Sequence, residues 1–242
     1  MNPEDSITHK TIYVKLTNRC NLTCDHCYNA VCHDQGQMSA NTLQKILDYI
    51  YDLKEQGYDV DVALHGGEPT LYRDKDALWD FVLACNEMNV PITMTTNLVF
   101  KVDDTDIALF SKFKQADGEP LVLTSWDYKI RFKPESLETT WKNSVTKILE
   151  AGIGVQPIVS LTKLLIEEKT PRDIFEYMNK VGSDVVDSDD SWDLNCPYDA
   201  FTSQSGLIIL KEYMQTIKRK KMSIMRQTEN VDDFNATYRR KR

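Results

Sequence analysis

Residues 20–28 read Cys20-Asn21-Leu22-Thr23-Cys24-Asp25-His26-Cys27-Tyr28. The three cysteines in this run have the spacing C-x3-C-x2-C, and three thiols in one short loop suit a metal centre better than a disulfide. Thiolates are soft ligands that favour iron–sulfur clusters, zinc or cuprous copper. A cubane cluster of iron and sulfur and a structural zinc ion both take four ligands as a rule. The three cysteines therefore leave one position open, where a substrate or cofactor can bind.

A zinc site is the alternative to an iron–sulfur cluster in this loop. The fourth ligand of such a site would come from His26, His33 or Cys32. Zinc loops usually combine two halves that resemble C-x2-C, whereas this loop contains one, from Cys24 to Cys27. The spacing therefore favours an iron–sulfur cluster and leaves zinc open.

A second motif, Gly66-Gly67-Glu68-Pro69, comes just after the expected strand of residues 60–64. In this order, and each placed after an expected strand, the two motifs resemble those of the radical S-adenosylmethionine (radical SAM) enzymes. The resemblance covers about residues 11 to 190 as an architecture. Around the motifs, residues 18–28 and 66–72 most resemble the branch that modifies peptides and proteins.

The resemblance implies two cofactors and a radical reaction. Cys20, Cys24 and Cys27 would bind a [4Fe–4S] cluster, and its open iron would bind S-adenosylmethionine through the amino and carboxylate groups. One electron then cleaves the sulfonium bond, and the resulting 5′-deoxyadenosyl radical takes a hydrogen atom from the substrate. An external electron donor of the flavodoxin or ferredoxin type would supply the electron. The cofactors carry the chemistry, and the protein positions them.

The resemblance also implies residues that contact S-adenosylmethionine. His26 would lie near the adenine, although an exposed loop histidine is an equally good interpretation. Gly66 and Gly67 would let the backbone approach the cofactor closely. Glu68 would accept a hydrogen bond from the ammonium group of the cofactor.

Two further cofactor contacts are expected beyond the third and fourth strands. Asn97 and Ser125 match positions that hold the ribose or the carboxylate in many relatives, although either residue is also able to cap a helix or a turn. Relatives often carry Ser-x-Asp-Gly after the fourth strand, whereas Asp127 is followed here by Tyr128. No role is therefore assigned to Asp127. The catalytic groups that act on the substrate are not identified.

Short β-rich runs alternate with helical runs along the chain. The expected strands are residues 11–16, 60–64, 92–96, 121–125, 155–161 and 185–186, of which the fifth is weakened by Pro157. The expected helices are about residues 40–56, 74–88, 104–113, 134–151, 171–182 and 206–221. This alternation indicates an α/β fold with parallel strands and right-handed crossovers. The resemblance specifies a partial (β/α)6 TIM-like barrel with its helices outside, followed by a C-terminal helix and a basic tail.

The motifs fall where such a barrel has its functional sites. Cys20, Gly66, Asn97 and Ser125 come just after the first four expected strands, and sites in these barrels lie at the carboxyl ends of the strands. We divide the chain into an N-terminal segment (1–10), the barrel (11–200) and the C-terminal helix with its basic tail (201–242).

Charge is unevenly distributed along the 242 residues, whose net charge is −8. Residues 211–242 contain ten Lys or Arg against four acidic residues, a balance of +6, which leaves −14 for residues 1–210. The acidic body argues against a broad nucleic-acid surface, because phosphate contacts need clustered cations. The basic end either contacts an anionic partner or is a solvated helix end with a tail.

Nothing in the sequence predicts contact with a membrane. No apolar run approaches the roughly 20 residues that span a bilayer, and residues 1–10 lack the apolar stretch of a signal peptide. We therefore expect a cytoplasmic protein with reduced cysteines. Cys85 falls on an apolar helix face and is expected in the core. Cys32 and Cys196 are too few for a second cluster, although Cys196 could reach the barrel mouth.

The motifs do not specify the substrate, because one radical site can serve many reactions. A peptide or protein substrate is the first hypothesis, and a barrel without a cysteine-rich C-terminal extension would leave its mouth open to such a large molecule. A nucleotide or nucleobase substrate and activation of a glycyl-radical enzyme are the alternatives. A non-catalytic iron–sulfur protein is a more remote one, because electron transfer needs no site for the cofactor's amino group.

Overall fold

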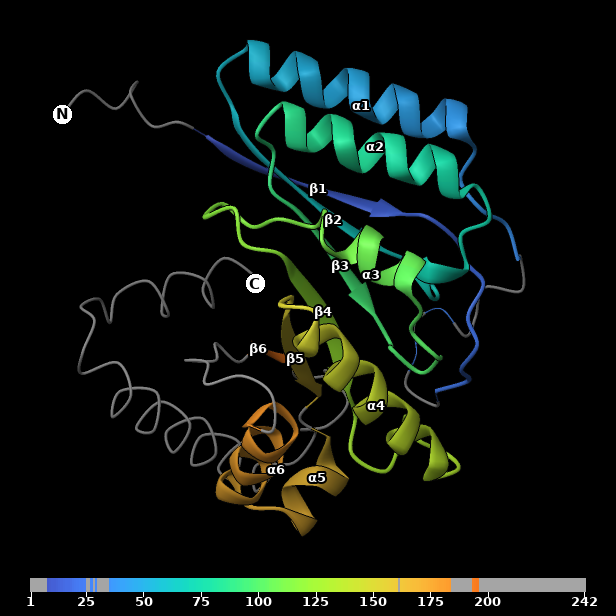
Figure 1. Ribbon diagram of the computed structural model, residues 1–242, viewed down its shortest axis with the longest axis vertical. Helices are drawn as coiled ribbons and strands as arrows, with labels where there is room; N and C mark the ends of the chain where they lie inside the picture. The colour runs from blue at the N-terminus through green and yellow to red at the C-terminus, as the bar shows by residue number, and fades with distance from the viewer. Residues whose placement is uncertain are drawn as a thin grey trace, which may run out of the picture.

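The computed structural model describes residues 8–24, 27, 29, 35–160, 162–183 and 193–195. Within them, six parallel strands form one sheet in the order β1-β2-β3-β4-β5-β6 (Figure 1). The strands are β1 (His9–Lys15), β2 (Asp59–His65), β3 (Ile92–Thr96), β4 (Leu121–Trp126), β5 (Gly154–Ser160) and β6 (Asp193–Asn195). Each strand pairs with the next one along the chain, as in a (β/α) barrel. The expected α/β fold is confirmed.

Helices alternate with the strands and cover one face of the sheet (Figure 1). They are α1 (Ala40–Glu55), the 3-10 turn η3 (Pro69–Leu71), α2 (Lys75–Glu87), α3 (Asp104–Phe110), α4 (Ser136–Glu150), α5 (Lys163–Glu168) and α6 (Pro171–Ser183). α1 packs beside α2, and α4 packs beside α6. The predicted C-terminal helix and basic tail, 201–242, lie outside the described residues.

The side-chain alternation of the strands separates a buried face from an accessible face. In β2, Val60, Val62 and Leu64 are fully buried in the core that α1 and α2 cover, whereas Asp61 and His65 are half-buried on the opposite face. In a strand with this period-2 pattern, one face packs against the core and the other face remains accessible. Burial of the apolar set therefore orients the polar residues at the strand ends away from the helices.

Local signals in the sequence explain the helix boundaries. The Ser39 hydroxyl accepts a hydrogen bond from the Thr42 amide at 3.1 Å and caps α1 at its N-terminus. Gly57, with φ +83°, lies just beyond the end of α1. Asp103 and Asp106 form a reciprocal capping box at the start of α3. These caps confirm the predicted positions of α1 and α3, although α3 ends at Phe110 rather than at residue 113.

Several boundaries differ from the expectations. α4 begins at Ser136 rather than at Pro134, which follows a cis peptide bond. Pro157 lies inside β5, one residue before the segment that pairs with β6. The expected strand at 185–186 lies outside the described residues, and β6 at 193–195 pairs with β5. The short α5 was not expected, because a six-residue helix carries little periodicity.

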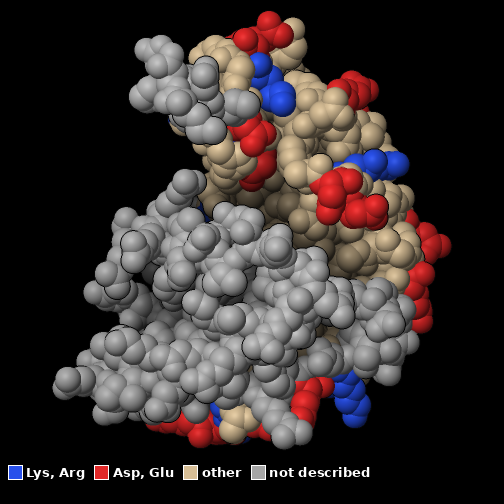
Figure 2. Space-filling view, turned by 90° about the vertical axis from the view of Figure 1, so that its left-hand side faces the viewer, with Lys and Arg blue, Asp and Glu red and all other residues tan. Residues whose placement is uncertain are grey.

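No helix in the described part of the chain combines the length and the apolar composition that crossing a bilayer requires. On the face shown in Figure 2, Asp and Glu side chains are spread over the described surface, with fewer Lys and Arg among them. This distribution agrees with the negative balance of residues 1–210.

Candidate functional site

The cysteine loop follows β1 at the carboxyl end of the sheet. Cys24 is buried, and Cys20 and Cys27 are half-buried. The Leu22 amide donates to the Cys20 Sγ at 3.4 Å, and the Cys27 amide donates to the Cys24 carbonyl at 3.1 Å. All three predicted ligands thus come from one loop at the expected edge of the sheet. His26, Cys32 and His33 lie outside the described residues, so the contact predicted for His26 stays a prediction.

The environment of the loop favours neutral thiols until a cation binds. Burial raises the pKa of the Cys20 thiol, and the Leu22 amide partly opposes this effect. Burial also raises the pKa of the Cys24 thiol, and the positive charge of Arg131 opposes it. A metal centre reverses this balance because a coordinated thiol is deprotonated. In the described residues, no three His, Cys, Asp or Glu side chains converge on a single-ion site.

The fourth described cysteine is different. Cys85 lies fully buried in α2 among apolar residues, and burial raises the pKa of its thiol to about 12. It belongs to the core, as the apolar helix face predicted. Cys196 lies outside the described residues.

The glycine loop packs directly against the backbone that leads into the cysteines. The Gly67 amide donates to the Thr17 carbonyl and the Glu68 amide to the Arg19 carbonyl, both at 2.7 Å. A Cβ on Gly66 would lie 2.6 Å from the Thr17 oxygen, and one on Gly67 would lie 2.3 Å from the Arg19 oxygen. Both glycines are therefore required for this backbone contact. The sequence predicted a close approach of a cofactor at these positions, and that approach stays a prediction.

Glu68 is the most thoroughly hydrogen-bonded side chain at this edge of the sheet. Its side chain is buried, with 1% of the residue exposed. One carboxylate oxygen accepts from the Thr70 amide, the Thr70 hydroxyl and the Thr96 hydroxyl at 3.1, 2.8 and 2.7 Å. The other oxygen accepts from the Asn97 amide at 2.7 Å. Burial raises the pKa of the carboxyl group, and these donors act in the opposite direction.

The contacts of Glu68 connect two loops. A carboxylate oxygen has about two lone-pair positions; one oxygen of Glu68 takes three donors, from Thr70 and Thr96, and the other takes one, from Asn97, and keeps one position for a further donor. Glu68 therefore connects the glycine loop to the end of β3. The contact between Glu68 and the ammonium group of the cofactor remains a prediction.

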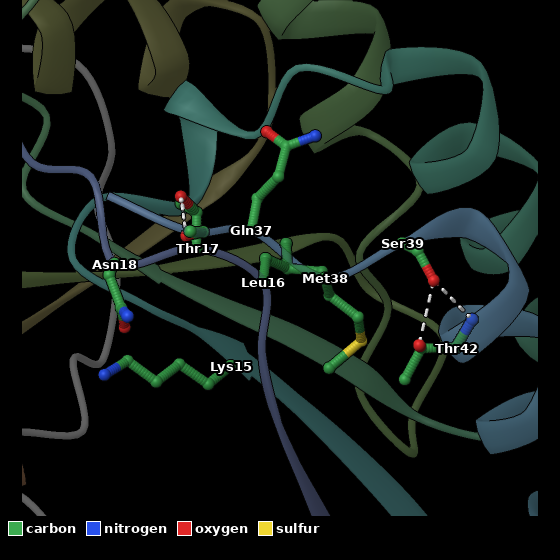
Figure 3. Close-up of a pocket in the computed structure, with 9 residues that line it drawn as sticks. Lys15, Leu16, Thr17, Asn18, Gln37, Met38, Ser39 and Thr42 are labelled. Atoms are coloured by element: carbon green, nitrogen blue, oxygen red, sulfur yellow. Dashed lines mark hydrogen bonds between the residues drawn. The ribbon is translucent and has the colours of Figure 1, made fainter. Parts of the chain in front are cut away.

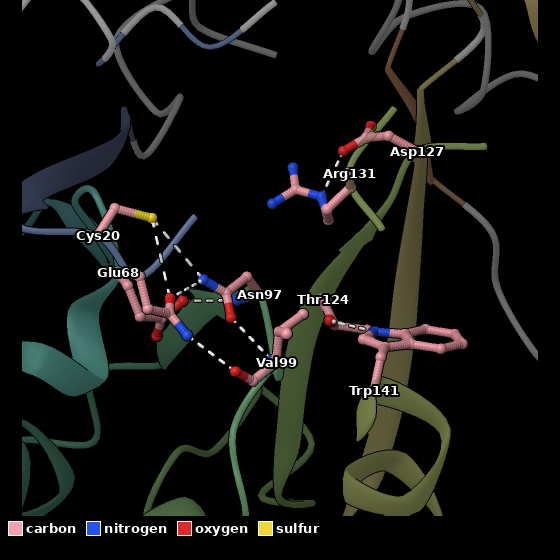
Figure 4. A network of polar contacts seen from close by, with 9 residues as sticks. Cys20, Glu68, Asn97, Val99, Thr124, Asp127, Arg131 and Trp141 are labelled. Atoms are coloured by element: carbon pink, nitrogen blue, oxygen red, sulfur yellow. Dashed lines mark hydrogen bonds and ion pairs between the residues drawn. The ribbon is translucent and has the colours of Figure 1, made fainter. Parts of the chain in front are cut away.

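Asn97 continues this network into the cysteine loop (Figure 4). Its Nδ2 donates to the Asn21 Oδ1 at 2.7 Å and to the Cys20 Sγ at 3.8 Å. Its Oδ1 accepts from the Val99 amide at 2.8 Å, and the Asn21 Nδ2 donates to the Val99 carbonyl at 2.8 Å. Asn21 was not predicted, because a polar residue between cysteines carries no signal of its partner.

The end of β4 contributes a buried ion pair. Asp127 is fully buried and its carboxylate pairs with the Arg131 guanidinium four residues later. In Figure 4 the guanidinium points from β4 toward the side of Cys20 and Asn97, in agreement with its effect on the pKa of the Cys24 thiol. Arg131 was missed, although the i,i+4 spacing from Asp127 is a usable signal. Ser125 lies inside β4, half-buried on the accessible face, rather than beyond the strand.

An open hollow of about 470 Å³ lies beside this site, at the end of β1 and the start of α1 (Figure 3). Lys15, Thr17, Asn18, Gln37 and Ser39 are among its lining residues. It contains none of the predicted cofactor contacts. It borders the same Thr17–Asn18 backbone on which the glycine loop packs.

Comparison with known proteins identifies the family. The model of the Radical SAM superfamily matches residues 14–181, which is more than half of the chain. An uncharacterised protein of Methanocaldococcus jannaschii is 26% identical, over 62% of this chain and 53% of its own length. A probable GTP 3′,8-cyclase of Methanocella arvoryzae is 28% identical, over 73% of this chain and 50% of its own length. The chain therefore spans about half the length of these relatives.

Solved structures share the fold. The enzyme anSMEcpe with bound AdoMet and the Kp18Cys peptide superposes with a TM-score of 0.62 at 11% identity, over 88% of this chain and 62% of that one. Streptococcus suis SuiB bound to the precursor peptide SuiA superposes with a TM-score of 0.60 at 16% identity. The match covers 93% of this chain and 48% of the SuiB chain. Members of the matching superfamily use a [4Fe–4S] cluster and S-adenosylmethionine. On its family match, its partial-barrel fold and its cysteine loop, the chain belongs to the Radical SAM superfamily.

Proposed function

We propose that this protein cleaves S-adenosylmethionine reductively at a [4Fe–4S] cluster held by Cys20, Cys24 and Cys27, and acts on a peptide or protein substrate. One observation carries the proposal. The Gly67 and Glu68 amides bond to the backbone just before the cysteines, so the two motifs form one continuous surface at the carboxyl ends of β1 and β2. This arrangement supports the proposal because it brings the proposed metal ligands and the proposed cofactor-binding loop side by side.

The residues fit the two cofactors on three counts. The donor set is soft, with Cys24 buried and Cys20 and Cys27 half-buried, which suits an iron–sulfur cluster. The positive charge of Arg131 acts on the buried Cys24, which helps to balance thiolate charge. Within the described residues, the buried Asn29 Oδ1 has no hydrogen-bond partner, while its Nδ2 donates to the Asn18 carbonyl at 2.7 Å. That oxygen offers an acceptor to an ammonium group.

The chain's own residues hold and orient the cofactors in this proposal. When bound, the cluster and S-adenosylmethionine supply the one-electron chemistry that yields a 5′-deoxyadenosyl radical for hydrogen abstraction. The thiolates of the cysteine loop hold the metal, and the Leu22 amide stabilises the Cys20 sulfur. The hydrogen bonds that Glu68 accepts from Thr96 and Asn97 hold the glycine loop against the end of β3. An external electron donor of the flavodoxin or ferredoxin type remains part of the proposal.

Product analysis tests the proposal with a matched pair of cysteine variants. The full chain, reconstituted with iron and sulfide without oxygen and reduced with dithionite, is expected to release 5′-deoxyadenosine from S-adenosylmethionine. Cys24→Ala should lose the iron, the brown absorbance and the product, whereas Cys85→Ala should keep all three because Cys85 lies in the core. Unchanged iron content in Cys24→Ala, or a wild-type cluster that never yields 5′-deoxyadenosine, would refute it.

The peptide or protein substrate is supported by similarity of fold and of motif. The residues around both motifs resemble the peptide-modifying branch, and anSMEcpe and SuiB were both solved with peptides. A nucleotide is the second candidate, since the Methanocella arvoryzae relative is a probable GTP 3′,8-cyclase. The Kp18Cys peptide and GTP are suitable probes. Faster 5′-deoxyadenosine formation with the peptide favours the first candidate, and faster formation with GTP alone favours the second.

A further inference from the structure

The side-chain amide of Asn97 faces a metal ligand. Its Nδ2 lies 3.8 Å from the Cys20 Sγ and 2.7 Å from the Asn21 Oδ1, so one nitrogen serves both acceptors. The Leu22 amide approaches the same sulfur at 3.4 Å. Among the described residues, Cys20 thus receives two N–H donors, one from its own loop and one from the end of β3, seventy-seven residues away. Only the second is a side chain, and only this donor can be changed by mutation without altering the cysteine loop.

Three fixed contacts determine which way the amide points. The Val99 amide donates to the Asn97 Oδ1 at 2.8 Å, which places oxygen on that side and nitrogen on the side of Cys20. The Asn97 backbone amide donates to the buried Glu68 carboxylate at 2.7 Å. Asn21 contacts both Asn97 and the Val99 carbonyl. With 4% of its surface exposed, Asn97 has little freedom to turn its nitrogen elsewhere.

We infer that Asn97 is a positioning residue that sets the reduction potential of the cluster by donating an N–H to the sulfur of Cys20. This inference rests on the proposed function, because it needs a cluster on the cysteine loop. It stands beside the predicted contact of Asn97 with the ribose or carboxylate of S-adenosylmethionine, which stays a prediction: the amide nitrogen already has two protein acceptors, whereas the amide oxygen has one donor and keeps one lone pair. Glu68 has the supporting task of holding the Asn97 backbone in place.

The direction of the effect follows from charge. A cluster that accepts one electron from an external reductant becomes more negative, and part of that charge lies on the thiolate sulfurs. An N–H dipole aimed at a thiolate stabilises the reduced form more than the oxidised form, and hydrogen bonds to the sulfurs are a known determinant of cluster potentials. Asn97 is buried and Cys20 is half-buried, so the dipole acts through a lower dielectric than that of water. Asn97 therefore makes the cluster easier to reduce.

The test is a redox titration of the full-length reconstituted protein, followed by the EPR signal of the reduced cluster. Asn97→Asp keeps an oxygen for the Val99 amide and replaces the donor nitrogen with a charged oxygen. The equilibrium constant for one-electron reduction should fall roughly tenfold, which is a downward shift of about 59 mV in midpoint potential. Asn97→Ala, which removes the donor without adding charge, should shift the potential in the same direction by less.

A distant asparagine provides the matched control. The Asn86 Nδ2 donates to the Lys112 carbonyl at 3.0 Å and links α2 to the segment after α3. Asn86→Asp removes a comparable amide contact and should lower the stability of the protein without moving the midpoint potential. Because the charge introduced by Asn97→Asp lowers the potential by itself, Asn97→Ala carries the test of the donor: a purely structural contribution of Asn97 would leave the midpoint of iron-loaded Asn97→Ala at the wild-type value.

Every outcome decides between these interpretations. A wild-type midpoint in either iron-loaded Asn97 variant overturns the inference. Loss of iron from both variants, with the fold intact by circular dichroism, also overturns it, because Asn97 would then only hold the loop in place. A wild-type protein that binds no cluster refutes the proposed function itself, so the two failures are distinguishable.

Discussion

The two ends of the parallel sheet both use acidic side chains for polar contacts, but in opposite surroundings. At the carboxyl ends, Glu68 and Asp127 are buried at 1% and 0% exposure, and Glu68 accepts from the neutral amide and hydroxyl donors of Thr70, Thr96 and Asn97. At the amino ends, His9 bridges Asp59 and Asp61 at 2.8 and 2.6 Å, with about half of its side chain exposed. Both sets of contacts involve carboxylates, but those at the amino ends are exposed to water and those at the carboxyl ends are buried.

Because of this difference in burial, the loss of a polar contact should cost more stability at the carboxyl end of the sheet than at the amino end. A buried carboxylate that loses a partner keeps the full cost of its desolvation, whereas an exposed one is rehydrated. The carboxyl end is also where the cysteine and glycine loops meet. We expect substitutions at that end to change both stability and cofactor binding, and substitutions at the amino end to change stability only slightly.

The largest effect is expected from the ion pair after β4. Arg131→Met leaves the fully buried Asp127 carboxylate without its cationic partner, and breaking a buried pair in this way costs about 3–5 kcal/mol. Urea unfolding should show this loss. Lys147→Met, which removes an exposed pair with Asp104 at 3.0 Å, should leave the free energy of unfolding nearly unchanged. Equal effects of the two variants would contradict the distinction between buried and exposed contacts.

A somewhat smaller effect is expected at the glycine loop. In Gly67→Ala the new Cβ would lie 2.3 Å from the Arg19 carbonyl oxygen, so the backbone must shift at a cost of about 1–3 kcal/mol. Because that backbone leads into the cysteines, the variant should also bind less iron. Gly154→Ala meets the Leu121 side chain at 3.1 Å, which can move. If it matches Gly67→Ala in iron content and stability, the contact between the two loops is not essential.

The hydroxyl of Thr96 tests one donor of the Glu68 network. Thr96→Val removes the 2.7 Å hydrogen bond to the buried carboxylate with little change in shape, and a bond to a charged group contributes about 1.5–3 kcal/mol. Thr93 lies on the opposite, half-buried face of the same strand, so Thr93→Val is the matched control and should cost much less. Urea unfolding of both variants separates the lost bond from the general effect of a β-branched apolar residue.

The position of the site was predictable from the sequence, and its internal contacts were not. Cys20 and Gly66 each follow a short β-rich run, so the parallel topology placed both motifs at one edge of the sheet. The pairing of Asn21 with Asn97 joins residues seventy-six positions apart and depends on the order of β1, β2 and β3 in the sheet. No local pattern in the sequence encodes such a partner.

The glycines and Glu68 show a second limit of sequence interpretation. The motif correctly indicated that Gly66 and Gly67 tolerate no side chain, but the obstructing atoms are backbone oxygens of Thr17 and Arg19. For Glu68, the motif suggested an acceptor for a cofactor, which stays a prediction, but it gave no sign of the four protein donors that connect the carboxylate to the end of β3. A sequence motif indicates which residue types a site requires. The contacts that impose this requirement can be identified only in the folded structure.

The smallest effect is expected at the amino ends of the strands and depends on pH. The hydrogen bond that His9 donates to the Asp59 carboxylate raises the pKa of His9 above its ordinary value. The pair therefore stabilises the protein fully below about pH 6.5, the unfolded pKa of histidine, and the contribution disappears as the pH rises through the folded value. Because His9 and Asp59 are largely exposed, the contribution should not exceed about 1 kcal/mol. Urea unfolding of wild type and His9→Gln at about pH 6 and pH 9 measures it. The two proteins should differ more at the lower pH, and a larger difference at the higher pH would show that neutral His9, rather than its charge, joins β1 to β2.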